Sequence, residues 1–462
     1  MGQRYEWDVR RPRDRHLMPG GPKRILTIDG GGIRGLLSCG ILLHIENELK
    51  SRIADPVARE KFVLADYYDF IAGTSTGSIV AAWLALGNRV VDLQQLYLEM
   101  GSNIFSKARR FGQVFVAKFD ADKLATELHN QLGEVTLSSD ALVTGFGVTA
   151  KRMDTGSAWL LANNPKARYW DGSDTDRPNA DYQLRHVVRA SAAAPAYFDH
   201  VDVQIEHGRE PGAFMDGAVA GLNNPSTAFW LYTTLPGYGL KWPNGADNLL
   251  ITSVGTGHYR QRFSGRKLGR MAAIKQAIFS LAGSIQDVAQ QQLLLMQALS
   301  VPHRPYPINS EVDSLTNQDN AAAGQYQTYC IATQPQFHFQ RYDANLEARG
   351  LAALGITAED GRPLGPRMIK NLQAMDCSNA ANLQRLKDTG ERAGEMQVSA
   401  EQFPESFNIS VMGKAAEPSL SETLGQQVPT PSQSRHATTS PADISPGSNN
   451  QQRRGLFGFG KK

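Results

Sequence analysis

Two stretches of the sequence decide the fold, each a short apolar run followed by a glycine-rich turn and an apolar helix. They read KRILTIDGGGIRG at residues 23–35 and YYDFIAGTSTGSIVAAWLAL at residues 67–86. The β-branched and aromatic residues before each turn predict a strand, and the longer apolar runs after it predict helices at 33–50 and 78–86. Gly87 and Asn88 then end the second helix. Two such units predict a mostly parallel sheet covered by helices on both faces, an α/β fold.

The remaining sequence extends this pattern and suggests three parts. Further strands are expected at 141–150, 158–163, 201–205, 213–216 and 249–254, and further helices at 121–131, 184–194 and 271–299. Residues 1–22 are expected to form a polar N-terminal arm, and residues 23–412 one α/β domain. Within it the core motifs lie in 23–257, and 258–412 is a helical C-terminal part. Ser, Pro, Gln, Thr and Asn dominate after Lys414, so residues 413–462 are predicted to be a disordered tail.

Composition excludes several classes of protein. With 462 residues, 41% apolar residues and 20% charged residues, the chain has the profile of a soluble enzyme. A net charge of +3 is too small to predict a nucleic acid partner. Cys39, Cys330 and Cys377 form neither a disulfide framework nor a metal spacing, and no apolar run reaches the roughly 18 residues of a membrane span. A cytoplasmic protein is expected, and the basic, Phe-containing end RRGLFGFGKK leaves room for peripheral membrane association.

The second glycine turn predicts a catalytic serine. Gly73-Thr74-Ser75-Thr76-Gly77 follows an apolar strand and opens an apolar helix. A serine on such a sharp turn stands clear of the sheet, where a base can activate it. The alternative is a glycine-rich turn in which Ser75 only caps the helix.

The first glycine turn predicts an oxyanion hole. Backbone N–H groups of successive glycines at a helix start can approach a developing negative charge without a Cβ in the way. The spacing Gly30-x-Gly32-x-x-Gly35 also fits a dinucleotide-binding fingerprint. That motif requires an acidic residue closing a second strand about 20 residues later, and a helical segment occupies this region instead. The expected oxyanion loop comprises Gly30, Gly31, Gly32, Ile33, Arg34 and Gly35.

A base for Ser75 has two candidates. Asp216 begins Asp216-Gly217-Ala218 at the end of an expected strand, where burial would raise its basicity. His258 follows a later strand, and the order Ser75, Asp216, His258 fits an ordinary hydrolase triad. Sequence order alone leaves both open.

Taken together, these motifs resemble the patatin-like phospholipases, whose members carry them in the same order. Segments 189–198 (RASAAAPAYF) and 250–257 (LITSVGTG) add to the resemblance, which covers about 23–257 and makes 23–412 a patatin-like catalytic domain. It implies a three-layer α/β/α fold, with Ser75 as nucleophile and Asp216 as general base in a Ser–Asp dyad. It also implies that the backbone of Gly31 and Gly32 forms the oxyanion hole, and that Arg34 holds this loop or a substrate phosphate. Ser78 departs from the glycine that many members carry there.

The resemblance implies a phospholipase A-type enzyme that cleaves lipid esters at membrane surfaces without metal or cofactor. A second hypothesis is a regulated bacterial effector of the same fold, either a toxin or a nucleotide-activated antiviral phospholipase. It would need a site for a regulatory small molecule, and no nucleotide-binding loop is recognisable in the sequence. Two further hypotheses are a Ser-Asp-His esterase and a non-catalytic lipid-binding protein. The last would have an eroded site, whereas every expected group is present here.

Overall fold

A computed structural model describes most of the chain up to residue 412. The described residues are 5–104, 121–172, 177–195, 197–205, 210–260, 269, 273–301, 304–309, 315 and 331–412. All described residues belong to the first of two units into which the chain divides, Met1–Glu417. The tail expected at 413–462 lies outside the described residues.

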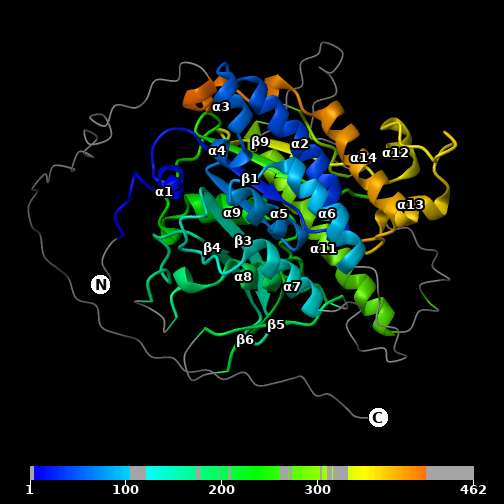
Figure 1. Ribbon diagram of the computed structural model, residues 1–462, viewed down its shortest axis with the longest axis horizontal. Coiled ribbons are helices and arrows are strands. Elements are labelled where there is room, and N and C mark those ends of the chain that lie inside the picture. Colours follow the sequence, from blue (N-terminus) through cyan, green and yellow to red (C-terminus); the bar gives the residue numbers. More distant parts are fainter. Residues whose placement is uncertain are drawn as a thin grey trace, which may run out of the picture. The chain divides into compact units, whose positions relative to one another are not determined.

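A nine-stranded, mostly parallel sheet forms the centre of the first unit (Figure 1). Its order is β5-β6-β3-β2-β1-β7-β9-β8, and β4 pairs with β3 off this path. Strands β3, β2, β1, β7, β9 and β8 run parallel to one another, whereas β4 and β6 pair antiparallel with β3 and β5 pairs antiparallel with β6. The strands are β1 Lys23–Ile28, β2 Phe70–Gly73, β3 Gly145–Arg152, β4 Ser157–Ala162, β5 Val201–Val203, β6 Gly212–Asp216, β7 Leu249–Val254, β8 Ser300–Val301 and β9 Phe337–Tyr342.

Helices cover both faces of the sheet. The larger core lies under α2, α5, α6 and α14, and the smaller core lies under α9 and the end of α11. Neighbouring strand residues alternate between the two cores, as Ile25 and Leu26 do, because successive side chains of a strand point to opposite faces. The helices are α1 Pro12–Leu17, α2 Gly35–Ser51, α3 Pro56–Lys61, α4 Leu64–Tyr67, α5 Thr76–Ala85, α6 Val90–Ile104, α7 Ala121–Leu132, α8 Leu184–Ser191, α9 Ser226–Thr234, α11 Ala273–Ala298, α12 Ala348–Ala353, α13 Pro366–Gln373 and α14 Ala380–Gln397.

Short 3-10 helices fill several connections. Two of them matter for the site, η1 at Gly32–Arg34 and η3 at Gly217–Ala220. The others are η2 Asn179–Asp181, η4 Pro236–Tyr238, η6 Ala400–Gln402, η7 Glu405–Phe407 and η8 Ser410–Met412.

The three-layer α/β fold with a mostly parallel sheet is confirmed, with three local differences. Strand β2 begins at Phe70 rather than Tyr67, because Tyr67 ends α4. The expected polar arm contains α1, whose Asp14 and Leu17 are fully buried. The C-terminal part, expected to be helical, also supplies β8 and β9 to the sheet.

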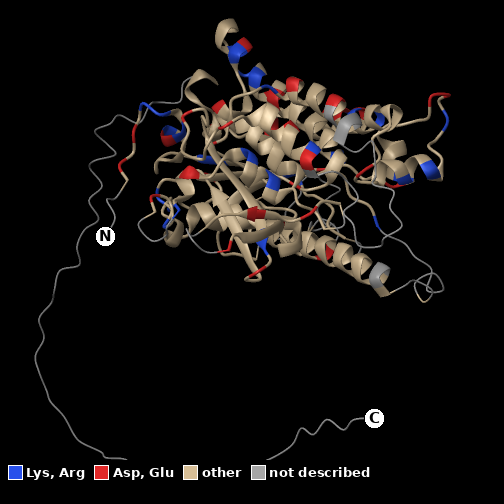
Figure 2. Cartoon of the chain, turned by 60° about the horizontal axis from the view of Figure 1, so that its bottom comes forward, with Lys and Arg blue, Asp and Glu red and all other residues tan. Residues whose placement is uncertain are grey.

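Charged side chains of both signs are intermingled over the described part of the chain (Figure 2). No helix among the described residues is both long and apolar enough to span a bilayer.

Candidate active site

Strands β2 and β6 meet end to end along one edge of β3. Strand β2 runs parallel to β3 and ends at Gly73 opposite Val148, whereas β6 runs antiparallel and ends at Asp216 opposite Ala150. Strand β4 pairs with β3 over a stretch that overlaps both contacts, so it occupies the other edge. Because β2 and β6 approach each other on the same edge, the turns that follow them, and the groups they carry, converge.

Ser75 lies in the turn between β2 and α5 with a strained backbone. Its φ is 55° and its ψ is −124°, a region that a non-glycine residue rarely adopts. A Cβ on Gly73 would lie 2.0 Å from the carbonyl oxygen of Gly77, so the turn can close only with glycine there. The Ser75 N–H donates to the hydroxyl of Ser191 at 2.9 Å. A strand, a sharp turn with a strained serine and a helix are also the elements of a nucleophile elbow.

The residues that flank Ser75 fix the turn. The Thr74 hydroxyl donates to the Leu222 carbonyl at 2.6 Å, and the Thr76 hydroxyl lies 2.5 Å from that of Tyr97. Ser78 donates through its hydroxyl to the Ser75 carbonyl at 2.6 Å. The small side chain at 78 is thus accommodated and adds a contact within the turn.

Asp216 is a buried carboxylate, and the neighbouring Ser75 side chain acts to lower its pKa. Its side chain also accepts the Ala218 N–H at 2.8 Å, because Asp216 is the N-cap of η3. The residue is 2% exposed. Burial raises the pKa of Asp216 to about 6, although the hydrogen bonds from Ser75 and Ala218 act in the opposite direction. A carboxylate with this pKa is ionised at neutral pH and basic enough to accept a proton from the serine hydroxyl.

The glycine loop lies against the same turn. A Cβ on Gly30 would lie 3.1 Å from that of Ser75, so the two residues are neighbours. Among the described residues, the N–H groups of Gly30, Ile33 and Arg34 donate to backbone carbonyls, whereas those of Gly31 and Gly32 have no acceptor. Gly32 has a φ of +60°, which glycine adopts without strain. Two free N–H groups beside a serine hydroxyl are suited to stabilise an oxyanion.

Side chains from three segments hold this loop. Thr256 donates to the Gly30 carbonyl at 2.8 Å, and Asn223 donates to the same oxygen at 3.4 Å. The Arg34 guanidinium donates to the carbonyls of Gly31 and Gly257 at 3.4 and 3.1 Å, and it stacks over the Tyr259 ring. Arg34 therefore links the loop to the turn after β7. Gly35 begins α2, where an added Cβ would lie 2.6 Å from the Thr76 hydroxyl.

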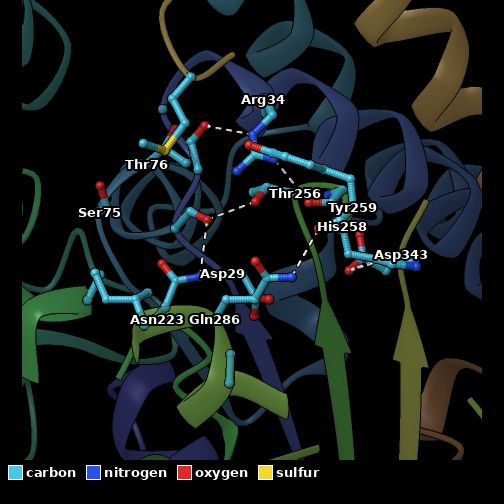
Figure 3. Close-up of a pocket in the computed structure, with 18 of the residues that line it drawn as sticks. Asp29, Arg34, Ser75, Thr76, Asn223, Thr256, His258, Tyr259, Gln286 and Asp343 are labelled. Atoms are coloured by element: carbon cyan, nitrogen blue, oxygen red, sulfur yellow. Dashed lines mark hydrogen bonds and ion pairs between the residues drawn. The ribbon is translucent and has the colours of Figure 1, made fainter. Parts of the chain in front are cut away.

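His258 lies elsewhere in the pocket. Its Nδ1 is 2.9 Å from the Tyr306 hydroxyl and 3.5 Å from Asp343. Figure 3 shows Ser75 and His258 on opposite sides, with Asp29 and Asn223 between them. The structure thus brings together Ser75, Asp216 and the glycine loop, and it gives His258 different partners.

One group of polar residues in the pocket was missed by the sequence analysis. Arg341 and Asp343, at the end of β9, form a buried ion pair at 2.9 Å, and Arg341 also pairs with Asp29. Arg341 lies in β9 and Asp343 directly follows it, and this strand was not predicted, so their place beside the glycine loop could not be inferred. The alternation Phe337-x-Phe339 before Arg341-x-Asp343 was the available signal for a strand ending in charged residues.

A large cavity contains these groups. Its volume is about 1380 Å³, above the roughly 300–1,000 Å³ of ordinary small-molecule sites. One wall is polar and carries Asp29, His258, Arg341 and Asp343, while α11 and the segment after α8 contribute apolar side chains. The apolar lining includes Ile79, Leu124, Pro195, Tyr197, Phe198, Ile278, Leu281, Ile285, Ala289 and Leu293. Among the described residues, no group of three or more His, Cys, Asp or Glu side chains is arranged to hold a metal ion.

Comparison with known proteins identifies the family. Residues 26–230 match the model of the patatin-like phospholipase family, "Patatin". The chain is 29% identical over 251 residues to Patatin-17 of Solanum cardiophyllum, covering 50% of this chain and 60% of that protein. It is 26% identical over 337 residues to Patatin-like protein 2 of Arabidopsis thaliana, covering 67% and 78%. It is also 26% identical over 284 residues to the Arabidopsis "Probable inactive patatin-like protein 9", covering 58% and 70%.

Two solved structures are also similar. Human GIVD cytosolic phospholipase A2 matches with a TM-score of 0.36 and 9% identity, covering 84% of this chain and 58% of that one. VipD from Legionella pneumophila matches with a TM-score of 0.30 and 11% identity, covering 82% and 68%. The family match over 26–230 contains the glycine loop, the Ser75 turn and the Asp216 motif, so these residues form a domain of the patatin-like phospholipase family.

Proposed function

We propose that the chain is a lipid acyl hydrolase, of phospholipase A type, that cleaves carboxylic ester bonds of glycerophospholipids or related lipids. The observation that carries the proposal is the convergence of the ends of β2 and β6, which brings Ser75 and the buried Asp216 together next to two unpaired N–H groups of the glycine loop. Nucleophile, base and oxyanion donors are the three parts that acyl transfer needs.

The proposed reaction begins when Asp216 accepts the Ser75 proton. The serine oxygen attacks the ester carbonyl carbon, and the N–H groups of Gly31 and Gly32 stabilise the negative charge on the carbonyl oxygen. Collapse of this intermediate breaks the ester bond, and the leaving alcohol takes the proton from Asp216. Water then gives a proton to Asp216, attacks the acyl-enzyme and releases the fatty acid, and the proton returns to Ser75.

The shape of the pocket supports a lipid as substrate. The cavity is large enough for more than a small ester, and apolar residues of α11 and of the segment after α8 line it. These side chains would contact the acyl chain while the ester lies at Ser75. A peripheral encounter with a membrane surface is part of this proposal, because the substrate resides there.

A histidine base has less support. Asp216 has Ser75 and Ala218 as partners, and His258 has Tyr306 and Asp343. A triad would require Asp216 to orient the histidine and the histidine to contact Ser75.

Release of fatty acid from phospholipid vesicles tests the proposal. Wild type should release it, Ser75→Ala and Asp216→Asn should lose nearly all activity, and Ser51→Ala, an exposed serine at the end of α2, should match wild type. Equal release by wild type and Ser75→Ala would refute the assignment.

A further inference from the structure

The loop that offers Gly31 and Gly32 is anchored by a buried ion pair from a distant part of the chain. Arg341 donates to both oxygens of Asp29, with Nη1–Oδ1 at 3.0 Å and Nη2–Oδ2 at 2.6 Å. Both side chains are nearly inaccessible, 4% and 7% exposed. Asp29 immediately precedes Gly30, so this two-point contact is made at the base of the loop.

The same guanidinium also holds the adjacent turn. Arg341 donates to Asp343 at 2.9 Å and to the Ser253 hydroxyl of β7 at 2.8 Å. Asp343 in turn accepts the Gly257 N–H at 2.7 Å. One side chain therefore connects the carboxyl ends of β1, β7 and β9, the edge at which the site lies.

Charge makes this arrangement depend on Arg341. Asp29 and Asp343 are two buried carboxylates, and the Arg341 guanidinium lies between them. Burial raises the pKa of Asp29 to about 6, and Arg341 is the largest influence that counteracts it. Without the guanidinium, the two carboxylates would repel each other beside the loop or take up a proton.

From these contacts we propose that Arg341 is a positioning residue for the reaction, setting where the N–H groups of Gly31 and Gly32 point. This inference rests on the proposed function. Arg341 lies outside residues 26–230, where the family model matches, so the shared motifs do not assign it a role. It acts through Asp29 on the loop, and not on the ester itself.

The chain offers a matched control at the opposite end of β1, the strand that Asp29 follows. Arg24, near the start of β1, makes the same two-point contact with Asp69, at 2.9 and 3.1 Å. This pair is also largely buried, with 12% and 3% of the two side chains exposed. It is a structural ion pair far along the strand from the glycine loop, so it separates a loss of stability from a loss of catalysis.

The test compares Arg341→Lys with Arg24→Lys on a soluble p-nitrophenyl ester. Lysine keeps the charge and loses the two-point contact. Removing one oxyanion donor costs roughly a hundred- to a thousandfold in kcat, so a misplaced loop should lower kcat about tenfold or more. We expect KM to change little in Arg341→Lys, because the loop acts on the transition state, and kcat of Arg24→Lys to stay within about twofold of wild type.

Two further measurements test the inference if Arg341→Lys folds poorly. Asp29→Asn keeps the shape of the side chain and removes its charge, and it should show the same selective loss of kcat. Low concentrations of guanidinium should restore part of the activity of Arg341→Ala, since Arg341 lines the cavity and its place can be filled from the pocket.

Three results would overturn the inference. They are equal losses of kcat in Arg341→Lys and Arg24→Lys, a loss confined to KM, or full activity in both Arg341→Lys and Asp29→Asn. Failure of the proposed function would give a different result, because wild type would then hydrolyse no ester. The inference about Arg341 would fail together with the proposed function.

Discussion

As the proposed base for Ser75, Asp216 combines two properties that conflict, because a base must be ionised and a buried carboxylate is unstable when ionised. In the described part of the chain it has hydrogen-bond donors and no cation as partner. Burial raises its pKa from 3.8 to about 6, a difference of about two units. At 1.36 kcal/mol per unit, ionised Asp216 lowers the free energy of unfolding by about 3 kcal/mol.

The sign of this effect follows from the direction of the pKa change. Since the pKa is higher in the folded state, the folded protein binds the proton more tightly than the unfolded chain. Stability is therefore lost as pH rises from about 4 to about 6, and the full cost is present above about pH 6. Asp216→Asn removes the charge and keeps an oxygen for the Ala218 N–H.

We accordingly expect Asp216→Asn to be inactive and yet more stable than wild type, by up to about 3 kcal/mol at about pH 8. Most of this gain should disappear at about pH 4. Urea unfolding at both pH values measures it.

Asp69→Asn is the matched control, since Asp69 is a buried aspartate directly before β2 with the opposite electrostatics. Although burial alone would raise its pKa, Arg24, Lys23 and His16 hold the pKa of Asp69 well below the usual range. Loss of its charge leaves Arg24 unpaired and should destabilise the protein by about 3–5 kcal/mol at neutral pH. If Asp216→Asn were destabilised like Asp69→Asn at pH 8, the account of Asp216 as an uncompensated buried carboxylate would be wrong.

Three further predictions test the site from other directions. The kcat/KM of wild type should fall tenfold per pH unit below about pH 6, as Asp216 takes up a proton, and a flat profile down to pH 5 would exclude it as the base. His258→Gln should retain kcat within about tenfold in the same ester assay, whereas a loss of a thousandfold or more would favour the triad. On α11, Leu281→Gln should lower the ratio of kcat/KM for p-nitrophenyl laurate over p-nitrophenyl butyrate by about tenfold, because Leu281 lines the cavity. Leu295→Gln is the control, because Leu295 lies in the same helix with similar exposure (40%, against 37% for Leu281) but does not line the cavity. If both variants changed the ratio equally, α11 would have no part in recognising the acyl chain.

The sequence predicted the strands that lead to Ser75 and Asp216, but not how they meet. Ser75 was expected in the turn after its strand and Asp216 at the end of its strand, because glycines follow short apolar runs. Their convergence depends on β2 and β6 running in opposite directions along one edge of β3, and strand direction and pairing are set by contacts across about 140 residues of sequence. Local sequence patterns do not specify which strands pair or in which direction they run.

The ends of β1 and β9 show, in a different way, the same limit of prediction from sequence. The end of β1 was predicted because KRILTI is apolar and β-branched, and its Asp29 could be placed beside the glycines. The end of β9 was not predicted, because FHFQRY mixes His, Gln and Arg into a strand that is buried on all sides. Those polar side chains are tolerated only through partners from elsewhere, as Arg341 is through Asp29 and Asp343. A prediction from hydrophobic periodicity therefore misses a strand whose buried polar side chains are paired with partners from other segments.

This difference separates two kinds of residue in the site. Ser75, Asp216 and the glycine loop require particular backbone conformations, so short local motifs specify them and the family model covers them. Arg341 and the apolar face of α11 require only the right charge or surface at the right place, which many sequences can supply from any segment that reaches the site. The proposed chemistry of ester cleavage is therefore readable from residues 26–230, whereas control over the glycine loop and the acyl chain would reside in residues after 258. Variants of Arg341 and Leu281 should accordingly change rate and chain-length preference while Ser75 remains reactive toward a fluorophosphonate probe. Loss of that labelling in both variants, in folded protein, would show that the two parts are not separable.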